Sequence, residues 1–187
     1  MRRSLLALCL LACTAAAGPV PEPEGYWLGP IHGPLPASIT GGDVIHTAAL
    51  AALLRHGPVT LVDVASAPIP PPHMAAGALW LPLPHKDIPG SVWIPEAGQG
   101  VITRDLDAFF RHRLDTLSGH DRNAVIVTYC HESCWMSWNA AKRAISYGYR
   151  NVHWYPDGVE AWTGAGYPVA AVHAEGPGAA AQQEHPD

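Results

Sequence analysis

The sequence is poor in charged residues and contains no long basic run. Charged residues make up 14% of the 187, with 11 Lys and Arg against 16 Asp and Glu, so the formal net charge is -5. Nucleic-acid binding relies on clustered Lys and Arg that contact phosphates, and we therefore expect no nucleic-acid partner. After the first residues, no apolar run reaches the roughly 20 residues that span a bilayer, so we expect no transmembrane segment in the mature chain.

Cysteine is also scarce, and two of the four cysteines, Cys9 and Cys13, fall in the first 17 residues. Those residues combine two arginines, an apolar run at 5–11 and small residues before Gly18, which is the pattern of a signal peptide over 1–17. The pattern predicts export to the periplasm. The run that ends in Cys13 also resembles a bacterial lipobox, so a lipid anchor on Cys13, in the outer or inner membrane, stays open beside simple cleavage.

The mature chain then keeps Cys130 and Cys134 only. In an oxidising compartment two nearby thiols tend to pair. The spacing supplies no second pair of cysteines, and the 11 histidines are scattered without pairing at metal-ligand spacing. We therefore expect neither a metal centre nor another cofactor.

Composition divides the rest of the chain into three parts. Residues 18–42 form a Pro- and Gly-rich extension, in which Tyr26 and Trp27 are expected to pack onto the domain. Residues 43–170 carry the periodic segments of one folded domain, and 171–187 read as a disordered tail.

Helical and strand patterns alternate within the domain. Thr47 looks like the cap of a helix that stops at Gly57, and Cys134 precedes a helix that stops at Gly148. The other expected elements are strands at 59–64, 78–81, 125–129 and 152–155, a surface excursion at 83–102, a helix at 103–119 and a helical turn at 159–162. This alternation predicts an α/β fold with one doubly wound parallel sheet and helices on both faces.

The order of elements places the thiol of Cys130 at the carboxyl end of a strand, facing the start of a helix. In open parallel sheets ligands bind beyond the strands' carboxyl ends, and helix-terminal N–H groups stabilise anions and lower a thiol's pKa. Cys130 is therefore the candidate nucleophile. Cys134, four residues on, is either a resolving partner or half of a static disulfide, and a copper site at the two cysteines stays a weaker alternative.

These residues resemble a known family. The order LVDV, HMAAGALWLP, the Cys130 loop and GYRNVHWYPDGVEAWTGAGYPV is similar to a rhodanese domain. Within it, YCHESCWMSWNAAKRA and SVWIPEAGQG resemble the exported Cys…Cys-Trp proteins associated with PQQ-dependent alcohol catabolism. The resemblance implies a periplasmic setting and, as partner, a quinoprotein dehydrogenase or a cytochrome c.

Carried over residue by residue, the resemblance implies three roles. Cys130 matches the cysteine that forms a persulfide, and Asp63 matches the acidic residue at the end of the first core strand. The following residues match the loop whose N–H groups hold an anion: His131, Glu132, Ser133, Trp135, Met136 and Ser137. This loop departs from the sulfurtransferase pattern, because it has no Gly or Arg and places Glu132 where an anionic donor would approach.

Three functions follow as hypotheses. The first is sulfurtransferase or persulfide chemistry at Cys130. The second is a thiol–disulfide redox component that uses Cys130 and Cys134. The third is a non-catalytic accessory module whose loop and Trp135 bind a quinoprotein dehydrogenase or copper.

Overall fold

The computed structural model describes residues 20–74 and 83–177, in which four helices and seven strands are found. The helices are α1 (Thr47–His56), α2 (Arg104–Leu117), α3 (Trp135–Ser146) and α4 (Gly158–Gly164). The strands are β1 (Asp43–Val44), β2 (Thr60–Asp63), β3 (His85–Asp87), β4 (Val92–Trp93), β5 (Ile126–Tyr129), β6 (Val152–Trp154) and β7 (Ala170–Val172). No helix in the described part is long and apolar enough to cross a membrane.

Five strands form one parallel sheet in the order β1-β6-β5-β2-β4. All four residues of β5 are buried, as are the last three of β2. Strands buried on both faces carry continuous apolar runs, because neither face meets water. The register sets Asp63, at the end of β2, directly beside Tyr129, the residue before Cys130.

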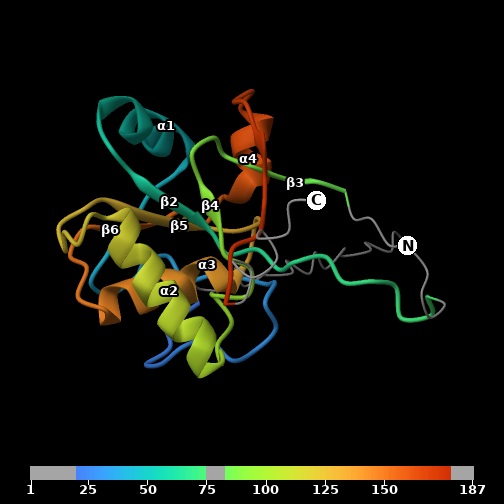
Figure 1. The fold of residues 1–187 in the computed structure, drawn as a ribbon. Helices are drawn as coiled ribbons and strands as arrows, with labels where there is room; N and C mark the ends of the chain where they lie inside the picture. Colours follow the sequence, from blue (N-terminus) through green and yellow to red (C-terminus); the bar gives the residue numbers. More distant parts are fainter. Residues whose placement is uncertain (1–19, 75–82, 178–187) are drawn as a thin grey trace, which may run out of the picture.

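The helices cover both faces of this sheet (Figure 1). Phe110 of α2 packs with α3 in one apolar cluster, whereas Leu50 of α1 and Trp162 of α4 lie in a second cluster. The α/β fold with a doubly wound parallel sheet is therefore confirmed.

The helix ends agree with the sequence except at the start of α1. Thr103 caps α2 as expected, because its hydroxyl accepts the N–H of Leu106 at 3.2 Å. Thr47 instead is the first residue of α1, and its N–H donates to the carboxylate of Asp157 at 3.1 Å. Asp157 lies far along the chain, so the sequence pattern could not reveal this cap.

Two expected irregular segments are ordered elements. Residues 83–102 contain β3 and β4, and Ile88 and Ile94 there are fully buried. The start of the expected disordered tail forms β7, which pairs antiparallel with β3, and Glu175 binds Arg113 on α2. Local composition misled both predictions, because distant partners supply the pairing. The signal peptide expected over residues 1–17, Cys13, the strand expected at 78–81 and residues 178–187 lie outside the described residues.

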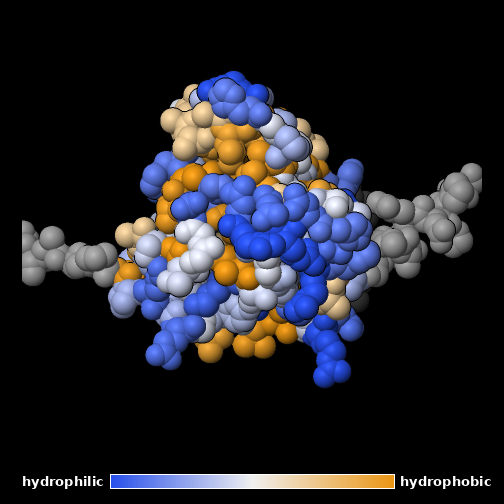
Figure 2. Space-filling model, turned by 90° about the vertical axis from the view of Figure 1, so that its left-hand side faces the viewer, coloured by the Kyte–Doolittle hydropathy of each residue, from blue (hydrophilic) through white to orange (hydrophobic). Residues whose placement is uncertain are grey.

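The amino ends of the central strands lie on the face that Figure 2 shows. This face is mostly hydrophilic, with apolar side chains exposed between the hydrophilic ones. A cavity of about 480 Å³ lies at this edge, lined by Leu53, Val59 and Leu117 among others. The thiols lie at the opposite, carboxyl edge, where parallel sheets bind their ligands.

Candidate functional site

Cys130 and Cys134 lie side by side at the carboxyl edge of the sheet. Cys130 directly follows β5, and Cys134 is the N-cap residue of α3. Both are free thiols, exposed by only 1% and 0%, and their side chains interact with each other. Two residues four apart in sequence therefore form one pair.

The pair is electrostatically uneven. The neighbouring Cys130 thiol lowers the pKa of Cys134, and the backbone N–H groups of Met136 and Ser137 lower it further. The same contact with Cys134 raises the pKa of Cys130, together with burial and the negative charge of Asp63. The helix start was expected to activate Cys130. Its N–H groups serve Cys134 instead, because Cys134 is the residue that caps the helix.

The loop that was expected to hold an anion uses several of its N–H groups within the protein. The N–H of Glu132 donates to the carboxylate of Glu160 at 3.0 Å, and the N–H of Trp135 donates to the carbonyl of Ile31 at 2.7 Å. Those of Met136 and Ser137, in the first turn of α3, lower the pKa of the Cys134 thiol. Ser133 has a φ of 56°, which lets the chain turn tightly between the two cysteines.

Acidic side chains surround the outer side of the loop. His131 pairs with Glu160 at 2.6 Å, and both side chains are partly exposed. A groove of about 460 Å³ runs along the loop, and Glu132, Asp157 and Glu160 line it without any Lys or Arg among the lining residues. Like charges repel across such a groove, so a small anionic donor meets an unfavourable potential there.

The N-terminal extension covers the thiol loop from the other side. Gly33 donates its N–H to Ser133 at 3.0 Å, and this bond and the one from Trp135 to Ile31 flank Cys134. Trp27 stacks on Trp135 with 4.2 Å between the ring centroids. The packing of Trp27 onto the domain is as predicted, and Trp135 is consequently buried rather than presented as a binding surface.

Asn139 of α3 holds this extension in place. Its side-chain oxygen accepts the N–H of Trp27 at 2.8 Å, and its side-chain nitrogen donates to the carbonyl oxygens of Trp27 and Gly98 at 3.1 and 2.9 Å. One buried amide thus joins the extension, α3 and the segment after β4. The sequence marked Asn139 only as part of a helix.

Ser137 has a structural role in this arrangement. Its hydroxyl donates to the carbonyl of Cys134 at 2.9 Å and accepts the indole N–H of Trp154 at 2.9 Å. The hydroxyl of Thr128 donates to the carbonyl of Ser137 at 2.9 Å. These bonds fix the first turn of α3 against β5 and β6, and with it the position of Cys134.

Asp63 belongs to a second polar group beside the thiols. One of its oxygens accepts the N–H of Ala65 at 2.8 Å, so it caps the turn after β2, and the other lies 2.6 Å from Nε2 of His85. Asp87 approaches the same nitrogen at 3.9 Å. Sequence reasoning missed His85 and Asp87, because they lie in the segment expected to be a surface excursion. The spacing of His85 and Asp87, two residues apart, was the available signal, because side chains at this spacing on a strand lie on the same face.

A comparison with protein families shows to which family the chain belongs. Residues 46–165 match the family described as Rhodanese-like domain, which is more than half of the chain. The chain belongs to the rhodanese-like domain family. No curated protein matches it.

Three solved structures of bacterial proteins are among those to which this chain is structurally similar. A protein from Bacillus halodurans is 22% identical, with 69% of this chain and 77% of that chain covered and a TM-score of 0.45. The rhodanese-like domain of an Anabaena protein is 14% identical, with 78% and 85% covered and a TM-score of 0.47. Thiosulfate sulfurtransferase from Pseudomonas aeruginosa is 21% identical, with 74% of this chain but 21% of that chain covered and a TM-score of 0.48.

As a rhodanese-like domain, the chain is compatible with sulfurtransferase chemistry. Cys130 directly follows β5 and so lies at the carboxyl edge of the sheet, where parallel sheets bind their ligands. Its loop also holds a second thiol and acidic neighbours, and an extension lies over it. The second thiol, the acidic side chains and the covering extension limit which reactions this domain can carry out.

Proposed function

We propose that this rhodanese-like protein is an exported thiol–disulfide component in which Cys130 and Cys134 act as one redox pair. The observation that carries the proposal is the placing of two buried free thiols at the carboxyl edge of the sheet, one after β5 and one at the N-cap of α3, where they interact and the pKa of Cys134 is lowered. A lowered pKa supplies the thiolate, which is the reactive form of cysteine, and the neighbouring thiol supplies the resolving group.

The reaction has two exchange steps. The Cys134 thiolate attacks one sulfur of a partner's disulfide, a mixed disulfide forms, and the partner's other sulfur leaves as a thiolate. The thiol of Cys130 then gives its proton to that leaving thiolate and attacks the sulfur of Cys134. The Cys130–Cys134 disulfide forms, the partner's first sulfur leaves, and two electrons have passed from the pair to the partner.

The surroundings favour a partner that is not a small anion. The groove beside the loop carries Glu132, Asp157 and Glu160, which repel thiosulfate and similar donors. Both thiols are buried, so the extension with Ile31 and Trp27 must move before a sulfur can be reached. A protein that displaces the extension and presents a disulfide meets both conditions.

The resemblance to exported Cys…Cys-Trp proteins suggests where this reaction takes place. We propose a periplasmic protein that serves the maturation or protection of a quinoprotein dehydrogenase or a cytochrome c in PQQ-dependent alcohol catabolism. The proposal rests on the sequence motif CHESCW and on the signal pattern of residues 1–17. Processing at Cys13 would add a lipid anchor to the same assignment.

Matched variants and an uncharged small disulfide, bis(2-hydroxyethyl) disulfide, test the order of attack. With Cys130→Ser we expect a stable mixed disulfide of Cys134 with mercaptoethanol, seen as added mass, because the resolving thiol is gone. With Cys134→Ser we expect mixed-disulfide formation to be about ten-fold slower, since the remaining thiol lacks the helix N–H groups. Equal rates for the two variants, or a faster Cys134→Ser, would contradict the proposal.

Sulfur transfer at Cys130 is the second candidate, and the family membership and the place of Cys130 after β5 favour it. A Cys130 thiolate would attack the sulfane sulfur of a donor and release the rest of the donor, for example sulfite from thiosulfate. Cyanide would then take the outer sulfur of the persulfide as thiocyanate. If Cys130→Ser and the parent protein form thiocyanate equally from glutathione persulfide and cyanide, this candidate fails.

A further inference from the structure

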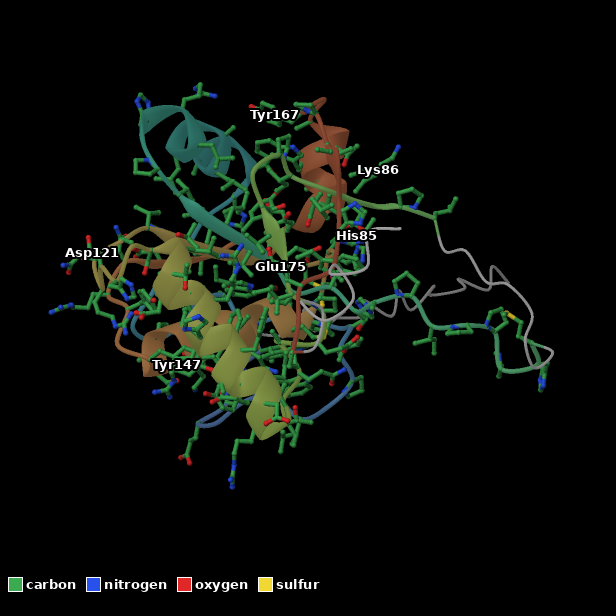
Figure 3. All side chains as sticks on the ribbon, viewed as in Figure 1. His85, Lys86, Asp121, Tyr147, Tyr167 and Glu175 are labelled. Atoms are coloured by element: carbon green, nitrogen blue, oxygen red, sulfur yellow. The ribbon has the colours of Figure 1, made fainter. Side chains whose placement is uncertain are left out.

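Asp63, His85 and Asp87 gather three potential metal ligands around one point next to the thiol site. One ligand atom from each residue lies within 4.8 Å of the other two. Asp63 comes from the end of β2, and the other two are at either end of β3. Figure 3 places His85 on the side of the molecule away from Asp121, which marks the amino edge of the sheet.

Each of the three residues directs one potential ligand atom toward the other two. His85 directs Nε2, which lies 2.6 Å from Oδ2 of Asp63 and 3.9 Å from Oδ2 of Asp87. The second oxygen of each carboxylate is held by the protein, that of Asp63 by the N–H of Ala65 and that of Asp87 by the hydroxyl of Tyr129. Such outer hydrogen bonds orient the ligands of metal sites.

Asp87 supplies an independent sign that a ligand is missing. Its side chain is 0% exposed, and within the described residues Oδ2 has no hydrogen-bond partner. Ser91 lies close by, but its hydroxyl donates its one proton to the carbonyl of Ile88 at 2.7 Å. A buried carboxylate oxygen without a partner is costly, and coordination to a cation removes that cost.

The charges of the cluster also call for a cation. Two buried carboxylates face one imidazole, and Lys86 of the same strand is exposed and leaves it in the other direction (Figure 3). Within the described residues no Lys or Arg pairs with Asp63 or Asp87.

We propose that Asp63, His85 and Asp87 form a binding site for one divalent first-row transition-metal ion, for which Zn²⁺ is the best match. Two carboxylate oxygens and one imidazole nitrogen are ligands that Zn²⁺ takes at about 2.0–2.2 Å, with water in the fourth position. The separations of 2.6 and 3.9 Å bracket the roughly 3.4 Å between neighbouring ligands of a tetrahedral ion, so small side-chain shifts suffice.

The site differs from any metal site at the cysteines, because its donors are oxygen and nitrogen. Its entrance is at His85, whose side chain is 13% exposed and stacks on Trp93 at 3.9 Å. A bound ion therefore lies beside an indole ring and next to the strand end that carries the thiols. The site does not depend on the redox function proposed for the cysteines.

The test uses untagged full-length protein freed of metal with EDTA, and Zn²⁺ as the probe in calorimetry and native mass spectrometry. All variants carry Cys130→Ser and Cys134→Ser, so that thiolates cannot bind the ion. We expect one Zn²⁺ per chain in this background, and at least a ten-fold weaker affinity after His85→Gln or Asp87→Asn. His120→Gln is the matched control, because His120 also lies beside a carboxylate, Asp115 at 2.7 Å, but is exposed.

Absorption with Co²⁺ provides a second readout that does not require identical stability of the variants. In the protein with both cysteines intact we expect weak ligand-field bands without thiolate charge transfer. Far-ultraviolet circular dichroism checks that each variant is folded. The proposal is overturned if no ion binds, if His85→Gln binds as tightly as His120→Gln, or if replacement of the two cysteines removes the binding.

Discussion

At the scale of single residues, the helix start lowers the pKa of Cys134, whereas the sequence led us to expect this effect at Cys130. The sequence places both cysteines at a strand–helix junction and so predicts the neighbourhood correctly. The difference arises from which residue caps α3, since the N–H groups of Met136 and Ser137 reach only Cys134. The sequence alone does not show which of two cysteines four residues apart faces the N–H groups of the helix, because that depends on where the first turn begins.

Removal of the neighbouring thiol should shift the titration of Cys134. In Cys130→Ala the Cys134 thiol loses the neighbour that most lowers its pKa, so its pKa should rise. Cys134→Ala should have the opposite effect on Cys130, whose raised pKa comes first from the contact with Cys134. The ultraviolet absorbance of the thiolate, followed against pH in both variants, measures the two shifts. Unchanged titration of Cys134 in Cys130→Ala would show that the thiols do not interact.

His153 should make the protein less stable in mild acid. Burial lowers the pKa of His153 below its usual value of 6.5, against a weaker attraction from Asp43. The unfolded chain therefore binds more protons than the folded one as pH falls through 6.5 toward the lowered pKa, and stability is lost in that window. Urea unfolding at several pH values should show a flatter acid dependence for His153→Gln. An equal dependence in both proteins would disprove the assignment.

At the scale of elements, the N-terminal extension has a role that its composition concealed. Its Pro and Gly content predicts an extended segment, and the packing of Trp27 was expected from its size. The pairing of Ile31 and Gly33 with the thiol loop depends on backbone groups, which carry no sequence signal. The same limit applies to β3 and β7, whose partners lie about 85 residues apart in register.

Loss of the Trp27 side chain should expose the thiols. Trp27→Ala removes the ring that stacks on Trp135 and loosens the extension over Cys134. We expect alkylation by iodoacetamide to become about ten-fold faster, because buried thiols react only when their cover opens. Leu28→Ala is the control, since Leu28 is 72% exposed and its loss should leave the rate unchanged. Equal rates for the two variants would show that the extension does not protect the site.

The start of α4 depends on the absence of a side chain at Gly158. Gly158 has a φ of +73°, and an added Cβ would lie 2.3 Å from the backbone nitrogen of Glu132. Gly158→Ala should therefore lower the free energy of unfolding by about 2–3 kcal/mol, through strain and the displaced loop. In Gly164→Ala nothing lies within 4 Å of the new Cβ, so stability should stay the same or rise slightly. Chemical denaturation compares the two; similar losses would contradict the steric explanation.

At the scale of the whole molecule, the parallel sheet explains why these sites lie together. Strands that run in the same direction bring Asp63, Cys130 and the start of α3 to one edge, and the alternation of elements predicts this from sequence. The approach of His85 and Asp87 to that edge depends on the packing of β3 against the rest of the molecule. Local periodicity does not predict such packing, and His85 and Asp87 were missed for this reason.

The central claim is that Cys130 and Cys134 form a reversible disulfide. The most direct measurement is intact mass after equilibration with dithiothreitol redox buffers and quenching by alkylation. We predict a two-hydrogen loss on oxidation and a reduction potential above about -300 mV, because a disulfide between residues four apart at a helix start is strained. Two results would contradict the account. One is a pair that stays fully reduced, and the other is a disulfide with a reduction potential below about -300 mV, as structural disulfides have.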